Sequence, residues 1–179
     1  MQHSQALYLF NEGSNFQAYR LLGAHVGDMG TVFRVWAPNA GRISVIGDFN
    51  GWHGDVHALH ALGASGVWEV TVPEALPGSL YRFEITNRHT GDKLIKGDPY
   101  ARGFEHRPGS AAYVVPPSAH AWGDADWLQR RAAWDWQQAP VNIYEVHAGS
   151  WMRHPDGTPY LWRELAERLI PYAMQQGYT

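Results

Sequence analysis

The sequence has no cysteine, little net charge and no long apolar run, and each absence narrows the class of protein. A chain without cysteine agrees with a reducing compartment. The 14 basic and 17 acidic side chains leave a net charge of -3, so no dense basic surface is available for nucleic acid or an anionic membrane. The first residues, Met1 to Gln5, lack the basic start and apolar middle of a secretion signal, and no run of about 18 apolar residues exists. We therefore expect a cytoplasmic protein that has neither nucleic acid nor a membrane as a partner.

Aromatic residues are abundant. The 179 residues include 9 Trp, 9 Tyr and 6 Phe, while only 17% of the residues are charged. Disordered chains have the opposite composition, with high charge and few aromatics. The composition therefore predicts a folded protein, and the length fits one to one and a half ordinary domains.

Short segments with a period of two occupy much of the chain. Every second residue is apolar in segments 33–37, 43–45, 68–72 and 81–85. Turn-forming residues such as Pro38-Asn39 and Asn50-Gly51 separate these segments. Short strands with one apolar and one polar face are typical of an antiparallel sandwich. We therefore predict an all-β fold, an immunoglobulin-like antiparallel β-sandwich over residues 27–116, preceded by a loosely structured lead-in segment at 1–26.

The rest of the chain has a different pattern. Residues 117–140 hold four tryptophans among charged residues, which predicts an irregular connector that packs its indoles against another surface, since each indole buries a large apolar area. The run at 141–146 predicts a strand, and leucines every four residues predict a helix over 161–176, with Gly177 where a C-terminal cap belongs. Pro171 predicts a kink or a break in that helix. Residues 141–179 therefore have the pattern of the first unit of a βα series.

Several segments together carry a family resemblance. Segments 30–40, 45–52 and 96–101 closely resemble the family 48 carbohydrate-binding module that precedes the catalytic barrel in α-glucan enzymes. Segments 141–151 and 162–172 are similar to the first strand and helix of the TIM-type, family 13 glycoside hydrolase barrel in bacterial 1,4-alpha-glucan (glycogen) branching enzymes. The run from Tyr144 to Trp151 favours branching enzymes over the trehalohydrolases and debranching enzymes of the same superfamily, which stay open as alternatives.

The resemblance implies a role in glycogen biosynthesis. The intact family cleaves an α-1,4-glucan, holds the segment on an aspartate and transfers it to a 6-hydroxyl by a retaining mechanism, without metal or other cofactor. The chain after Pro140 is far shorter than the about 250 residues of a complete barrel, so no catalytic residue is assigned to it. We expect an amino-terminal fragment that is inactive alone, with two partners: α-1,4-glucan or glycogen, and the missing catalytic barrel. A non-catalytic glucan-binding module and a module that only docks the barrel are the alternatives.

Four residues are candidates for carbohydrate binding. Trp52 follows the tight turn at 48–51, and an indole held at a sheet edge can stack on the apolar face of a pyranose. In glucan-binding modules of this family the matching Trp stacks on sugar, with Asn50 nearby and a basic residue at the position of Arg82. Trp36 is a candidate for the same face. The alternatives are that Trp52 closes the sandwich and that Trp36 packs between module and connector.

Other polar residues have simpler structural interpretations. Asp98 precedes a proline, which predicts a turn in which its carboxylate accepts backbone N–H bonds. His57 and His60 lack the further ligands of a metal site, so we predict no metal there and a solvent-facing loop or edge. Glu145 and His147 end the predicted strand, where they either shape a barrel pocket or order the following loop.

Overall fold

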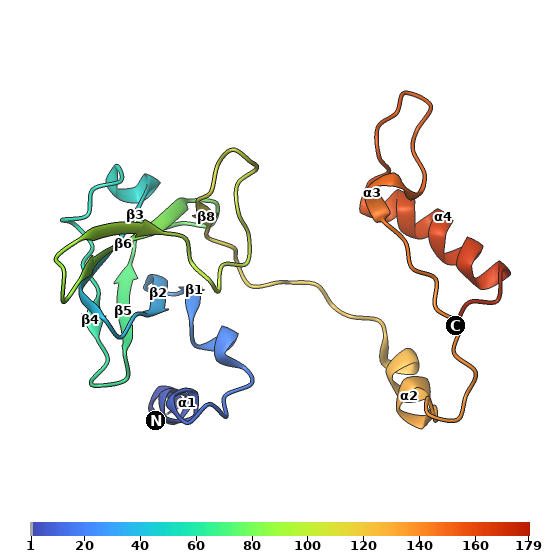
Figure 1. Cartoon of the computed structure of the whole chain (residues 1–179), viewed down its shortest axis with the longest axis horizontal. Helices are drawn as coiled ribbons and strands as arrows, with labels where there is room; N and C mark the ends of the chain where they lie inside the picture. The colour runs from blue at the N-terminus through green and yellow to red at the C-terminus, as the bar shows by residue number, and fades with distance from the viewer. Residues whose placement is uncertain (1) are drawn as a thin grey trace. The chain divides into compact units, whose positions relative to one another are not determined.

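The structure, a computed structural model, describes residues 2–179 and divides at Ala119 into two compact units, shown in Figure 1. The amino-terminal unit contains all the strands of the chain's described part, and the second unit contains three helices. No helix among residues 2–179 is long and apolar enough to span a membrane.

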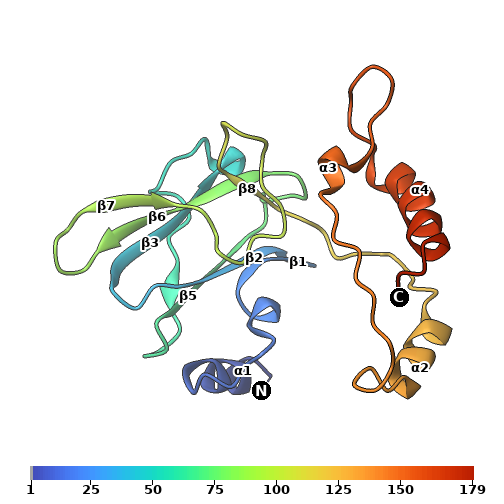
Figure 2. The same ribbon diagram turned by 45° about the vertical axis from the view of Figure 1, so that its right-hand side comes forward.

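The amino-terminal unit is a sandwich of two antiparallel sheets (Figures 1 and 2). The first sheet has the order β1-β2-β5-β4, and the second has the order β3-β6-β7 with β8 paired to β6. The strands are β1 (Gly23–Gly27), β2 (Gly30–Trp36), β3 (Ala40–Gly47), β4 (His60–Ala61), β5 (Val67–Val72), β6 (Leu80–Asn87), β7 (Lys93–Lys96) and β8 (Ala112–Tyr113). The predicted antiparallel sandwich is therefore confirmed, and every segment with a period of two overlaps a strand.

Aromatic side chains from both sheets form the centre of the core. Phe33 on β2 meets Tyr81 on β6 with 4.9 Å between ring centroids, and Tyr81 meets Phe83 at 6.0 Å. All three side chains have no exposed surface. Since neighbouring residues on each strand point to opposite faces, the core residues of β6 leave Arg82 and Glu84 on the outer face of the second sheet.

The segment expected to be a loosely structured lead-in is an ordered part of this unit. It forms helix α1 (Gln2–Asn11), the short helix η1 (Ala18–Arg20) and strand β1. Leu7 and Phe10 of α1 pack with Leu22 and Val67 in a second apolar cluster on the outer side of the first sheet. The sequence prediction missed this helix because its apolar residues show no sustained period, and their partner Val67 lies far along the chain.

The second unit contains α2 (Ala125–Ala133), α3 (Ala148–Trp151) and α4 (Trp162–Gln175). The predicted connector is thus partly helical, and its four tryptophans are between 45% and 78% exposed. Helix α4 confirms the predicted helix and continues through Pro171. Gly177 ends it with a φ of 78°, and the N–H of Gly177 donates to the carbonyl of Met174.

The predicted strand at 141–146 is not formed, so the first βα unit of a barrel is not confirmed. Strand geometry needs a neighbour that accepts and donates backbone hydrogen bonds, and this segment has one such contact. The N–H of Thr179 donates to the carbonyl of Asn142 at 3.0 Å. Ile143 and Val141 are exposed.

Candidate functional site

The outer faces of the two sheets differ in what covers them. Arg34 and Glu69 form an ion pair on the outer face of the first sheet, and Arg34 also donates to the carbonyl of Leu21 beneath the amino-terminal segment. Among the described residues, α1 contributes to the apolar cluster on the first sheet and to none on the second sheet. Instead, the loop after β3 folds over it, since Gly54 lies against the carboxylate of Glu84. On this face Ser44 and Ile46 of β3 are buried, while the residues of β7 are exposed.

A tight turn holds Trp52 at the end of this sheet, where β3 ends and β6 begins. The turn passes through helix η2 (Asp48–Asn50) and then two residues in the left-handed region, Gly51 with φ 59° and Trp52 with φ 65°. The N–H of Trp52 donates to the carbonyl of Gly47 at 3.0 Å, and its indole N–H donates to Asp48 Oδ1 at 3.2 Å. The indole is 39% exposed. Trp52 is thus anchored through its backbone N–H and its indole N–H while its side chain remains open to solvent.

Asn50 holds the turn from inside. Its Oδ1 accepts from the N–H of Gly47 at 2.9 Å, and its Nδ2 donates to the carbonyl of Val45 at 2.9 Å. The same Nδ2 lies 3.1 Å from Nδ1 of His57. Because all its polar groups are engaged within the protein, the Asn50 amide supports Trp52 from below and is not directed at solvent.

Arg82 lies at the same end of the sheet, opposite Ile46 in the ladder between β3 and β6. Its Nη2 donates to Oγ of Ser110 and lies 3.9 Å from Oε1 of Glu105. Glu105 Oε1 also accepts from the amides of Ser110 and Ala111, at 2.6 and 2.7 Å. The guanidinium is therefore drawn toward the loop before β8, and its Nε is buried without a hydrogen-bond partner.

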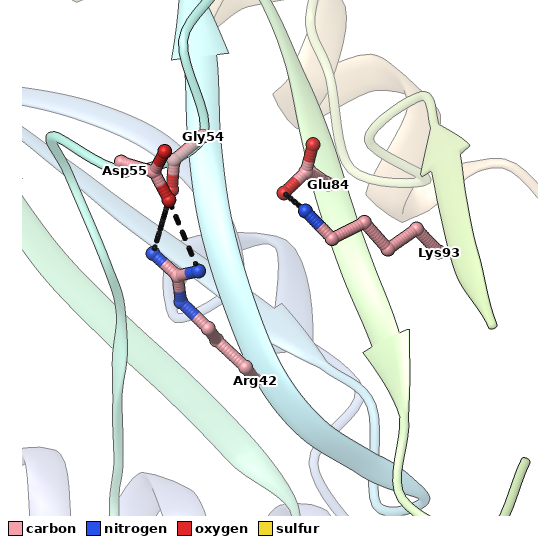
Figure 3. Close-up of polar contacts among 5 residues, drawn as sticks. All are labelled: Arg42, Gly54, Asp55, Glu84 and Lys93. Carbon is pink, nitrogen blue, oxygen red and sulfur yellow. Dashed lines mark hydrogen bonds and ion pairs between the residues drawn. The ribbon is translucent and has the colours of Figure 1, made fainter. Parts of the chain in front are cut away.

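Two ion pairs frame the other end of the face (Figure 3). Arg42 on β3 reaches the loop, with Nη1 3.3 Å from Asp55 Oδ1 and Nη2 donating to the carbonyl of Gly54 at 2.9 Å. Lys93 on β7 lies 3.4 Å from Glu84 on β6. Both pairs are partly exposed, so they contribute little stability, but they place charged groups along the sheet beyond Trp52.

The structure holds Trp52 and Asn50 in one turn, places Arg82 on β6 opposite Ile46, and leaves Trp36 on the first sheet. Trp36 ends β2 in the first sheet, is 53% exposed, and meets Phe10 of α1 edge to face at 6.2 Å. The whole of β3, with 8 residues, lies in the chain between Trp36 and the turn at Trp52, and it spans about 26 Å at about 3.3 Å per residue.

Sequence reasoning missed two residues that support the site. Asp48 joins the Trp52 indole to β6, because its Oδ2 accepts from the N–H of Leu80 at 2.9 Å. An Asp at the start of a turn is a sequence signal for such bonds. The His57 ring is only 17% exposed and contacts Phe49, so its predicted solvent-facing position is wrong. The sequence offered no signal for that burial. His60 is exposed as predicted.

The remaining candidate residues have structural partners. The buried carboxylate of Asp98 accepts from the hydroxyl of Tyr81 at 2.7 Å and from the N–H of Tyr100 at 2.8 Å, which confirms the turn. Burial raises the pKa of Asp98. His147 precedes α3, with its Nδ1 2.7 Å from Oγ of Ser150. No group of three or more His, Asp or Glu side chains among residues 2–179 is arranged to hold a metal ion.

Comparison with known proteins identifies the sandwich. The model of a protein family described as carbohydrate-binding module 48 (isoamylase N-terminal domain) matches residues 21–101. The matched residues include strands β1 to β7 of the sandwich. Over all 179 residues the chain is 82% identical to a 1,4-alpha-glucan branching enzyme of Dechloromonas aromatica, and over 177 residues it is 55% identical to one of Nitrosospira multiformis. It is similar to the amino-terminal region of these enzymes and spans 29% and 24% of their lengths.

Among solved structures, a type I pullulanase from Bacillus subtilis, complexed with maltose, is 32% identical over 56% of this chain and 14% of that chain, with a TM-score of 0.47.

The family 48 match includes Trp52, Asn50 and Arg82, whereas the loop that holds Arg82 lies beyond it. Ser110 and Glu105, which position Arg82, therefore lie in the sandwich but outside the matched range.

Proposed function

We propose that the family 48 module binds α-1,4-glucan on the outer face of its second sheet, around Trp52. The observation that carries this proposal is the indole itself, which is anchored by Gly47 and Asp48 but open to solvent. A fixed aromatic ring stacks on the apolar face of a pyranose without losing side-chain freedom on binding.

The polar groups around Trp52 suit the rims of the sugar rings. Pyranose hydroxyls both donate and accept hydrogen bonds, so they need partners of both kinds. Arg82 supplies guanidinium donors once its contact with Ser110 opens, and Lys93 and Glu84 offer a donor and an acceptor farther along the sheet. Asn50 acts by holding the turn. Trp36 lies too far away to contribute to the same stretch of glucan.

Binding of maltoheptaose tests this proposal with a matched pair of variants. Trp52→Ala should weaken binding about tenfold or more, equivalent to about 1.4 kcal/mol, while Trp36→Ala, which removes an exposed indole from the other sheet, should leave it unchanged. Urea unfolding of both variants supplies the control. If Trp52→Ala lowers stability and leaves sugar affinity intact, Trp52 only closes the sandwich.

For the intact protein we propose the activity of a 1,4-alpha-glucan branching enzyme, with a retaining transfer of a glucan segment to a 6-hydroxyl. The sequence identity to such enzymes supports it. In that protein residues 141–179 would be the first βα unit of the barrel, which agrees with helix α4 and with the contact between Thr179 and Asn142. The exposed apolar side chains of Ile143, Ile170 and Met174 would then be covered by the barrel.

The catalytic carboxylates of this proposed enzyme would lie outside these 179 residues. The purified chain should therefore show no branching when incubated with amylose, as followed by the iodine spectrum and by debranching of the product. Formation of α-1,6 branches by the chain alone would contradict this proposal, but it would not affect the proposal for sugar binding at Trp52.

A further inference from the structure

The Asn50 amide that supports Trp52 has only one workable orientation. Its Oδ1 accepts from the N–H of Gly47, and its Nδ2 donates to the carbonyl of Val45, both at 2.9 Å. Rotating the amide by half a turn would set a donor against the Gly47 N–H and an acceptor against the Val45 carbonyl. Two backbone groups thus determine that Nδ2, a donor, faces His57.

The amide in turn determines the protonation state of His57. Nδ1 of His57 lies 3.1 Å from Asn50 Nδ2, so it has to accept and therefore carries no proton. The proton of the neutral ring is then on Nε2, on the side of the Glu74 carboxylate, 3.7 Å away. A proton added to Nδ1 would place two donors face to face. Relieving that conflict would cost either the His57 contact or both backbone bonds of Asn50.

We propose that His57 is a positioning residue for the glucan site, which holds the Trp52 turn through Asn50 only while its imidazole is neutral. The inference rests on the proposed glucan binding at Trp52. Trp52 has a positive φ, a conformation that an L-residue adopts only when its surroundings enforce it. A proton on Nδ1 would break the contact with Asn50, so glucan binding should weaken in the protonated state of the ring.

The charged groups around the ring agree with this direction. Glu74, on the turn after β5, is largely exposed, and its carboxylate would stabilise a cationic His57 ring. Asp55, on the same loop as His57, is paired with Arg42, and Asp48 is occupied by Trp52 and Leu80. On the other side of the ring lie Phe49 and Nδ2 of Asn50, neither of which can accept a hydrogen bond from Nδ1.

A pH titration of the full chain followed by NMR tests the proposal. Between pH 8 and pH 5, the Asn50 side-chain amide and the Trp52 indole N–H should shift with the same midpoint as the His57 ring. Maltoheptaose affinity should fall roughly fivefold, the factor that corresponds to one lost hydrogen bond. His57→Gln, whose side-chain oxygen accepts at every pH, should remove the shared midpoint and the loss of affinity.

His60→Gln is the matched control, because His60 also lies beside a carboxylate, 3.8 Å from Glu69, but its ring is exposed. It should retain the pH dependence of wild type. Stationary Asn50 and Trp52 resonances while His57 titrates would overturn the proposal, as would equal maltoheptaose affinity at pH 8 and pH 5. If the resonances move together but maltoheptaose binds at neither pH, the coupling stands and the proposed glucan binding fails.

Discussion

Replacing Tyr81 with Phe removes the hydroxyl that donates to the buried carboxylate of Asp98. Tyr81 and Asp98 are 0% and 1% exposed, so water does not replace the missing donor. In the wild-type protein burial raises the pKa of Asp98, and the hydrogen bond from Tyr81 opposes that shift. The N–H of Tyr100 would remain as the donor to the other carboxylate oxygen.

The loss of stability should depend on pH. A hydrogen bond to a charged group contributes about 1.5–3 kcal/mol, so Tyr81→Phe should lower the free energy of unfolding at pH 7 by about 2 kcal/mol. Without the bond, the pKa of Asp98 rises further. A carboxyl with a raised folded-state pKa favours folding in its protonated form, and this contribution is lost as the pH rises through that pKa. The difference between variant and wild type should therefore be largest at neutral pH and smaller near pH 4.

Urea unfolding of the full chain, followed by far-UV circular dichroism at pH 7 and pH 4, measures both quantities. Tyr113→Phe is the control, since Tyr113 lies on the neighbouring strand β8 with its ring partly exposed, and it should change stability little at either pH. An equal loss for Tyr81→Phe at both pH values would refute the charge dependence. No loss at all would refute the buried hydrogen bond.

Two further substitutions test the turn and the helix end. Asp48→Ala removes the acceptor shared by the Trp52 indole and the Leu80 amide, and should weaken maltoheptaose binding roughly fivefold. Asp92→Ala, a matched change in the loop between β6 and β7, should leave the affinity unchanged. Unchanged affinity of Asp48→Ala in a fluorescence titration would contradict the role of Asp48. Gly177→Ala forces a side chain into a φ of 78° and should destabilise the end of α4 by about 1 kcal/mol. Amide exchange in the last turn of α4 should then be faster in Gly177→Ala than in the control Gly123→Ala. Equal exchange rates in the two variants would contradict the expected strain at Gly177.

The pattern of apolar residues was sufficient to predict the sandwich, because each strand buries one face and the period of two records which face that is. Phe33 and Phe83 were recognisable as core residues for this reason. The same reasoning failed at α1, whose burial depends on contacts with Val67 in another part of the chain. It also failed at 141–146, where β-branched residues are present but the strand neighbour is absent from the described residues.

The sequence alone determined that the chain forms an antiparallel sandwich, that a tight turn presents Trp52, and that a helix ends just before Gly177. These features depend on local chemistry: alternation, turn residues and backbone freedom. Only the tertiary structure decided that Asn50 faces inward, that His57 and Asp48 support the turn, and that Trp36 lies on the other sheet. Those outcomes depend on which residues the two sheets bring together, and distances between strands that are far apart in the sequence are not contained in any local pattern.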